Sequence, residues 1–243
     1  MPITRRRVLS GFLLAPAAFA ATELIAPRAA LAYTWTRTLA EGASGSDVIE
    51  LQIRVGGWAA DSAQQTFVAV DGAFGPGTRG AVVRFQRAYG LAADGVAGPA
   101  TQSKLNALES SDGSTAHFDF SEFHSKDGSG FSGGRVSAST VQENVRRLMY
   151  KLEAVRAKAG NRPMTINSGF RSINHNSNVG GASNSQHTYG IAADIVVSGV
   201  SVSGVMGHAK TSGFSGILRY STFTHVDSRA QYAYGAQAFY WQS

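Results

Sequence analysis

The 243-residue chain contains no cysteine. Disulfide bonds are therefore excluded, and the fold has to be stabilised by packed cores, with a bound metal as an additional cross-link. No run of lysine and arginine with interleaved aromatic residues is present, which argues against nucleic acid as a partner. The apolar stretch at residues 11–21 is too short and alanine-rich for a membrane span. With 43% hydrophobic residues and 28 glycines, the composition is typical of a compact protein with many turns.

The N-terminus has the features of an export signal. Three consecutive arginines, Arg5 to Arg7, precede the apolar stretch, and Ala30-Leu31-Ala32 matches the small-x-small cleavage pattern. We therefore predict a twin-arginine-type signal peptide over residues 1–32, and a secreted protein located outside the cell or in the cell wall. Removing this segment lowers the net charge from +6 to +3. The mature chain suits an anionic wall polymer as partner, and we expect a monomer with no membrane contact.

An internal repeat dominates residues 37–108. The pattern D-G-x-x-G-P-x-T occurs at 71–78 and returns at 94–101. Each copy predicts a turn that leads into a helix, because Asp-Gly favours the turn and proline fits the first helical turn. A third short helix is predicted before them, with Val48, Leu51 and Val55 on one face and Ser46 or Asp47 as its cap. These helices predict a small all-α domain.

This helical unit resembles the peptidoglycan-binding domain that accompanies many cell-wall hydrolases. The resemblance rests on the doubled motif together with Leu51-Gln52 and Phe85-Gln86. It implies that peptidoglycan is a partner of the protein. Residues 109–116 are small and polar, which predicts a flexible linker, and the second domain then occupies residues 117–243.

The second domain mixes helical and strand patterns. Thr140 and Glu143 predict a capping box at the start of a long helix that stops near Gly160. Its apolar stripe consists of Val141, Val145, Leu148, Met149, Leu152 and Val155. Strands are predicted at 164–168, 193–197, 217–220 and 223–226. We therefore expect a multidomain protein in which an α+β domain with an antiparallel sheet follows the helical one.

Two short segments of this domain carry metal-binding chemistry. The first is Ser185-Gln-His187-Thr-Tyr-Gly190-Ile-Ala-Ala-Asp194, and the second is Phe-Thr-His225-Val-Asp227. Zinc accepts imidazole nitrogen and carboxylate oxygen, and a hydrolytic site needs three protein ligands with a fourth position open. His187, Asp194 and His225 supply such a set, and Gly190 permits a sharp turn between the first two.

With the upstream segment Ser168-Gly-Phe-Arg171-Ser, these motifs resemble the zinc D-alanyl-D-alanine peptidases of cell-wall metabolism. The resemblance implies zinc-dependent hydrolysis of peptidoglycan stem peptides or cross-links, by carboxypeptidase or endopeptidase action. It implies that Arg171 binds a substrate carboxylate and that His187, Asp194 and His225 bind Zn²⁺. Ser185 is a further candidate for substrate binding.

One departure from this family concerns the general base. Several members carry a carboxylate three residues before the last zinc histidine, and Thr222 occupies that position here. Asp227 is then the nearest acidic candidate for the catalytic base, although in a strand it faces the same side as His225 and could instead orient that ligand. A swapped assignment, with Asp227 as ligand and His225 as acid or base, stays open. The alternative function is a non-catalytic, zinc-stabilised wall-binding protein.

Overall fold

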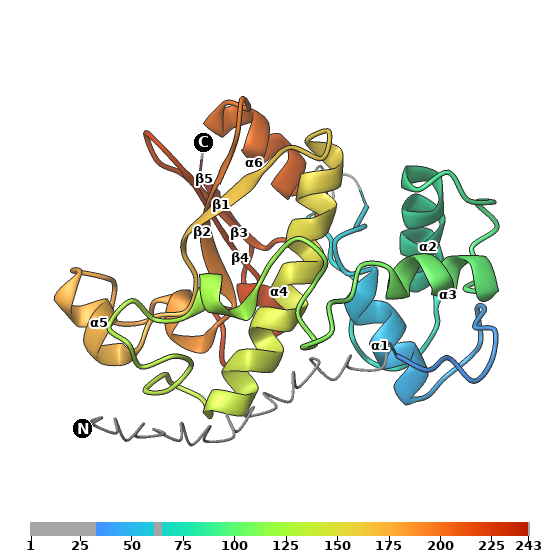
Figure 1. The fold of residues 1–243 in the computed structure, drawn as a ribbon, viewed down its shortest axis with the longest axis horizontal. Coiled ribbons are helices and arrows are strands. Elements are labelled where there is room, and N and C mark those ends of the chain that lie inside the picture. The colour runs from blue at the N-terminus through green and yellow to red at the C-terminus, as the bar shows by residue number, and fades with distance from the viewer. Residues whose placement is uncertain (1–32, 61–64, 243) are drawn as a thin grey trace, which may run out of the picture.

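The computed structural model describes residues 33–60 and 65–242, and the predicted signal peptide lies outside them. A helical unit comes first, with α1 (Ser46–Arg54), α2 (Pro76–Ala88) and α3 (Pro99–Asn106), and an α+β unit follows it (Figure 1). In the described part of the chain, no helix is both long and apolar enough to cross a membrane. The predicted order of an all-α unit before an α+β unit is confirmed.

Two glutamines explain the internal repeat. As predicted, α2 and α3 begin at the prolines of the two copies. The buried Gln52 side chain closes the first turn: its Nε2 donates to Asp71 Oδ1 at 2.8 Å and its Oε1 accepts from the Gly72 amide at 2.9 Å. Gln86 repeats these bonds in the second copy, with Asp94, Val96, Thr101 and Gly95. Each copy is therefore a turn fastened to the preceding helix.

The α+β unit contains a five-stranded sheet in the order β1-β2-β4-β3-β5. All neighbouring pairs are antiparallel except β3 and β5, which are parallel. The strands are β1 (Met164–Ser168), β2 (Ala192–Val197), β3 (Gly216–Arg219), β4 (Thr224–Asp227) and β5 (Tyr240–Gln242). The helices and 3-10 turns are η2 (Phe120–Phe123), α4 (Ala138–Lys158), α5 (Ile173–Asn178), η3 (Gln186–Tyr189), α6 (Val202–Lys210) and η4 (Arg229–Gln231).

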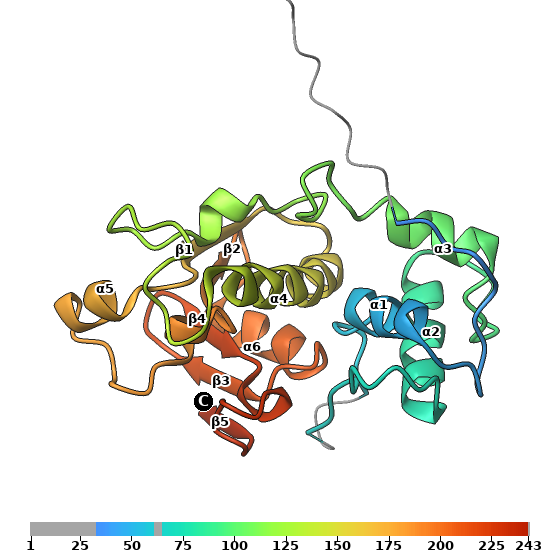
Figure 2. The same cartoon turned by 90° about the horizontal axis from the view of Figure 1, so that it is seen from below.

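One face of this sheet packs against α4 and α6 (Figure 2). Strand side chains alternate between the two faces, so Ala193, Ile195 and Val197 of β2 enter the core with Val226 of β4. The stripe predicted on α4 packs against them. The intervening residues of β2 and β4 therefore point to the opposite face, which leaves that face available for a site.

The helix starts differ from those predicted. The N-cap of α4 is Ser137, whose Oγ accepts from the Thr140 amide at 3.2 Å, while Glu143 pairs with Arg146 instead of closing a capping box. The α1 helix follows Gly45 and has no side-chain cap. Both errors arose because a capping residue was placed within three residues of the true start, where sequence alone does not fix the backbone turn.

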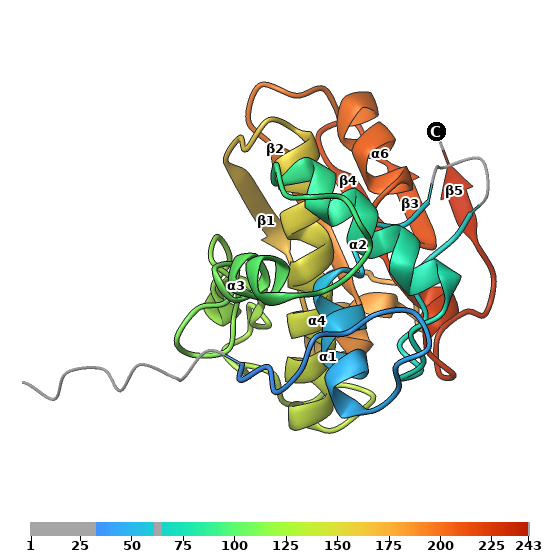
Figure 3. The same cartoon turned by 90° about the vertical axis from the view of Figure 1, so that its right-hand side faces the viewer.

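The two units share an interface along α4 (Figure 3). Tyr150 and Ala154 of α4 belong to the hydrophobic core of the helical unit. Glu50 of α1 accepts two hydrogen bonds from Arg146 at 2.9 Å each and a third from Arg54 at 2.7 Å. Burying apolar side chains and paired charges together fixes one domain against the other.

The segment 109–116, predicted as a flexible linker, instead forms a compact turn. The Ser110 amide donates to Ser114 O at 2.9 Å, and the Ala116 amide donates to Leu108 O at 3.0 Å. Ser114 and Thr115 are buried, and Glu109 pairs with the buried Arg54 at 2.9 Å. The polar composition that suggested flexibility serves hydrogen bonds within the turn.

Candidate metal centre

The register of two central strands brings three predicted site residues together. Asp194 of β2 lies directly opposite His225 of β4, and Ala192 lies opposite Asp227. Asp194, His225 and Asp227 consequently point to the same face of the sheet, away from α4. The prediction that a residue two positions after His225 shares its face is confirmed.

His187 reaches the same place from η3, which is followed by Gly190 with a positive φ of 74°. That left-handed conformation, which glycine adopts without strain, turns the chain into β2. His187 Nδ1 donates to Gly169 O at 2.6 Å, so its Nε2 is directed towards Asp194 and His225. The Arg171 amide also donates to His187 O at 3.1 Å and attaches η3 to the loop after β1.

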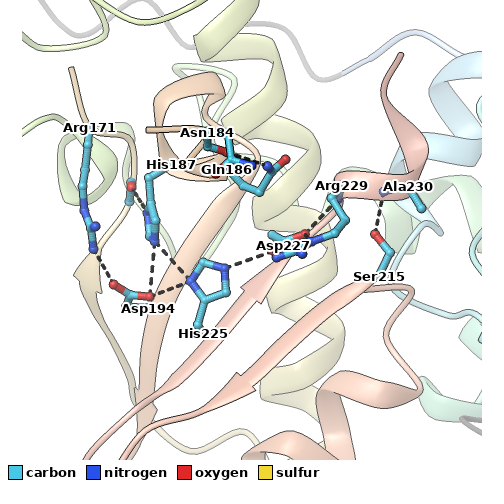
Figure 4. Close-up of polar contacts among 11 residues, drawn as sticks. Arg171, Asn184, Gln186, His187, Asp194, Ser215, His225, Asp227, Arg229 and Ala230 are labelled. Atoms are coloured by element: carbon cyan, nitrogen blue, oxygen red, sulfur yellow. Dashed lines mark hydrogen bonds and ion pairs between the residues drawn. The ribbon is translucent and has the colours of Figure 1, made fainter. Parts of the chain in front are cut away.

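Three ligand atoms form a small triangle (Figure 4). His187 Nε2 lies 3.2 Å from His225 Nδ1 and 3.3 Å from Asp194 Oδ1, and the last two atoms are 2.9 Å apart. In a tetrahedral zinc site with bonds of about 2.0–2.1 Å, neighbouring ligand atoms are about 3.3 Å apart. The donor types and their spacing therefore fit Zn²⁺, with one position left for water or substrate.

Asp227 lies on the other side of the His225 ring. Its Oδ2 is 3.1 Å from His225 Nε2, the nitrogen that faces away from the triangle. Asp227 is fully buried, and Arg229 donates to it through Nε and Nη2 at 2.9 and 2.6 Å. A carboxylate that accepts the distal N–H of a metal-binding histidine fixes the ring and its tautomer.

Arg171 contacts the centre directly. Its Nη2 donates to Asp194 Oδ2 at 2.7 Å, and its Nε donates to Ser168 Oγ at 2.8 Å. The guanidinium thus holds the second oxygen of a ligand carboxylate while Oδ1 faces the two histidines. Sequence reasoning assigned this arginine to substrate alone, and the structure adds a contact to Asp194.

A cavity of about 410 Å³ opens over the centre. It is lined by His187, Asp194 and His225, by Arg171 and Arg229, and by Ser185. The stacked rings of Tyr220 and Phe223, 4.4 Å apart, form part of its wall. Asp194 is the only carboxylate among the described residues that line it, and Thr222 is not among them. A general base at the family's usual position is therefore absent from the described lining.

The electrostatics of the centre keep both carboxylates ionised. Burial alone would raise the pKa of Asp194, but the close contacts of its carboxylate with His187 and His225 bring the pKa well below its usual range. The pKa of Asp227 is likewise lowered, against burial, by His225 and Arg229. Burial lowers the pKa of His187, and carboxylates on both sides of His225 raise its pKa against the effect of burial. Ionised aspartates and neutral histidines are the forms that bind metal, so the shifts of Asp194, Asp227 and His187 favour binding, whereas a protonated His225 has to release its proton.

Known proteins share this combination of domains. Residues 116–227 match the family described as Peptidase M15, and residues 44–105 match the family of peptidoglycan binding domains. Over 186 residues, the chain is 49% identical to the zinc D-Ala-D-Ala carboxypeptidase of Streptomyces albus G, covering 76% of this chain and 71% of that relative. The chain belongs to the peptidase M15 family. The prediction of a zinc metallopeptidase behind a peptidoglycan-binding domain is confirmed, and the comparisons do not support the alternative of a non-catalytic, zinc-stabilised wall-binding protein.

Other relatives of this M15 protein match smaller parts of it. A spore cortex-lytic enzyme of Bacillus cereus is 41% identical over 83 residues, which are 33% of this chain and 29% of the relative. A peptidoglycan-binding protein from Clostridioides difficile, known from a crystal structure, is 40% identical in sequence to the matched part. The match covers 30% of this chain and 42% of that protein's chain, with a TM-score of 0.26.

Three further residues of the M15 site were missed in the sequence. Arg229 donates hydrogen bonds to Asp227. Its position two residues after Asp227 in the sequence was the signal that could have identified it. Gly216 of β3 faces Asp227 so closely that a Cβ there would lie 2.1 Å from Asp227 Oδ2. Lys151 of α4 is buried and donates to Ser228 Oγ at 2.7 Å, which fastens the residue after Asp227 to the helix. Nothing local in the sequence marks the last two.

Proposed function

We propose that this M15 peptidase removes the terminal D-alanine from peptidoglycan stem peptides in a zinc-dependent hydrolysis. The observation that carries the proposal is the triangle of His187, Asp194 and His225 at the floor of a cavity that also presents Arg171. The Streptomyces relative is named for this activity. Peptidoglycan as substrate is also supported by the N-terminal domain, which belongs to a wall-binding family.

In this proposal His187, Asp194 and His225 hold Zn²⁺. When bound, zinc polarises a substrate carbonyl and makes water nucleophilic at neutral pH. Gly169 O and Asp227 fix the two imidazole rings from behind, and Arg171 fixes Asp194. Among the described residues, Arg171 donates to protein groups through Nε and Nη2, and we propose that its Nη1 binds the substrate carboxylate and sets the register of the peptide. Ser185 lines the cavity, which supports the proposal that it donates a hydrogen bond to the peptide.

The sequence made Asp227 the candidate for proton transfer, but its surroundings favour the role of orienting His225. It is fully buried, it faces the distal nitrogen of His225, and Arg229 occupies both of its oxygens. A carboxylate stabilised in its ionised form is a weak base. We therefore assign to Asp227 the positioning of His225.

Incubation of zinc-loaded protein with purified sacculi tests the proposed reaction. We expect free D-alanine in the supernatant and stem peptides shortened by one residue, both identified by mass. Release of monomers from cross-linked dimers would instead show endopeptidase action, which Arg171 also suits because a cross-linked residue presents a carboxylate beside the cleaved bond. The matched control is His187→Ala protein treated with zinc in the same way. Absence of both products with the wild-type protein would refute the proposal.

We also propose that the protein is exported and works as a monomer in or near the cell wall. The support is the arginine-led apolar segment of residues 1–32 and a family that acts on peptidoglycan. The mass of the protein recovered from the wall fraction reports the position of cleavage. A full-length mass there would contradict the signal-peptide assignment.

A further inference from the structure

A row of contacting arginine, aspartate and histidine side chains crosses the metal centre (Figure 4). Arg171 contacts Asp194 at 2.7 Å, Asp194 contacts His225 at 2.9 Å, and His225 contacts Asp227 at 3.1 Å. Arg229 ends the row with its contact to Asp227 at 2.6 Å. The two arginines therefore lie at opposite ends of one chain of contacts, with the zinc ligands between them.

Both arginines are presented to the cavity in the same way. Each lines it, with 18% of the Arg171 side chain and 17% of the Arg229 side chain exposed. Each donates through Nε and Nη2 to protein oxygens, and in the described part of the chain no hydrogen bond involves either Nη1. The Arg229 amide also donates to Asp227 Oδ1 at 2.9 Å, which restrains the residue further. A guanidinium held in this manner loses little entropy when it binds an anion.

The charge of the centre points to the kind of ligand. Two arginines balance Asp194 and Asp227, so a bound Zn²⁺ leaves the cavity with a net positive charge of about two if both histidines are neutral. A substrate with one carboxylate would leave part of this charge unbalanced. A substrate with two carboxylates, one on each side of the cleaved bond, would balance it.

We propose that Arg229 binds a second carboxylate of the substrate, on the opposite side of the metal from Arg171. The ligand class is a peptide that ends in a free carboxylate and carries an acidic residue on the N-terminal side of the cleaved bond. This inference rests on the proposed function and makes it more specific. Arg229 is then a specificity-determining residue as well as the partner of Asp227.

The test uses two peptides that both end in D-Ala-D-Ala. In one peptide the residue before this end has a free side-chain carboxylate, and in the other this carboxylate is replaced by a carboxamide. With the zinc-loaded wild-type protein, we expect the carboxylate peptide to have a KM lower by about 10- to 100-fold, the range for a charged hydrogen bond. Arg229→Gln should abolish this preference, so that the two peptides have similar KM values when both are measured with this variant. Arg229→Lys should retain part of it, since a point charge remains.

Arg219→Gln is the matched control, because Arg219 is exposed at the end of β3 and is not among the residues that line the cavity. Zinc content is measured for every variant, because Arg229 also holds Asp227. Calorimetric binding of the two product peptides to zinc-loaded wild-type protein gives the preference independently of any variant. Equal KM values and equal product binding for the two peptides in wild type would overturn the proposal, and so would an equal loss on both in Arg229→Gln. If wild type cleaves neither peptide, the proposed function itself fails.

Discussion

Replacement of His187 or His225 by alanine should leave the protein without bound zinc and without hydrolytic activity. Each histidine supplies one of three ligand atoms that lie within 4.8 Å of one another. Two remaining ligands do not complete a zinc site with three protein ligands. Metal analysis of the purified variants, together with the release of D-alanine from sacculi, measures both effects.

His208→Ala provides the matched control for these variants. His208 lies on α6, and its side chain is outside both the triangle and the cavity. This variant should keep one zinc per chain and wild-type activity. Stoichiometric zinc in both His187→Ala and His225→Ala would show that the metal is bound elsewhere.

Asp227→Asn should weaken zinc binding by about 10- to 100-fold and lower activity with it, the usual cost of losing the partner of a metal-binding histidine. The substitution removes the negative charge that faces His225 Nε2 and leaves Arg229 beside a neutral amide. Zinc affinity, measured by competition with a chelator, and kcat at saturating zinc separate the two possible roles. If Asp227 transfers a proton, kcat should instead fall by about 10²- to 10⁴-fold with zinc affinity retained.

Gly216→Ala tests the same assignment without changing Asp227. A methyl group at this position would lie 2.1 Å from Asp227 Oδ2, so the carboxylate has to move. We expect a loss of zinc affinity similar to that of Asp227→Asn. Wild-type rate and wild-type zinc affinity in both variants would remove Asp227 from the site.

Local sequence was sufficient to predict that His187, Asp194 and His225 lie together, because their positions depend on short-range rules. A glycine with positive φ redirects the chain from the end of η3 into β2. The alternation of side chains along β2 then decides to which face of the sheet Asp194 points. His225 was found through its motif, and its register opposite Asp194 follows once β2 and β4 pair. The proline and glycine pattern of the repeat placed the starts of α2 and α3 for the same reason.

Features that depend on distant contacts escaped the sequence. The short edge strand β5 pairs in parallel with β3 and has no alternation long enough to detect. The space that Gly216 leaves for Asp227 becomes evident only when β3 and β4 are paired.

The domain interface, in contrast, did have a signal in the sequence. Tyr150, Ala154 and Ala157 form a second apolar stripe on α4, which packs on the helical unit. A helix with two apolar stripes lies between two cores.

This shared helix has a mechanical consequence for an enzyme that works on an insoluble polymer. The α4 helix contributes to both hydrophobic cores, and a folded turn stands in place of a flexible linker. The wall-binding domain and the catalytic site therefore move together. A stiff connection between binding domain and catalytic site raises the effective concentration of peptide bonds that lie at one distance from the bound position on the wall. It lowers the effective concentration of all other peptide bonds towards zero. Each time the protein binds the wall, only the bonds at that fixed distance from the binding position are open to cleavage. The enzyme then has to dissociate from the wall before it can cleave bonds elsewhere.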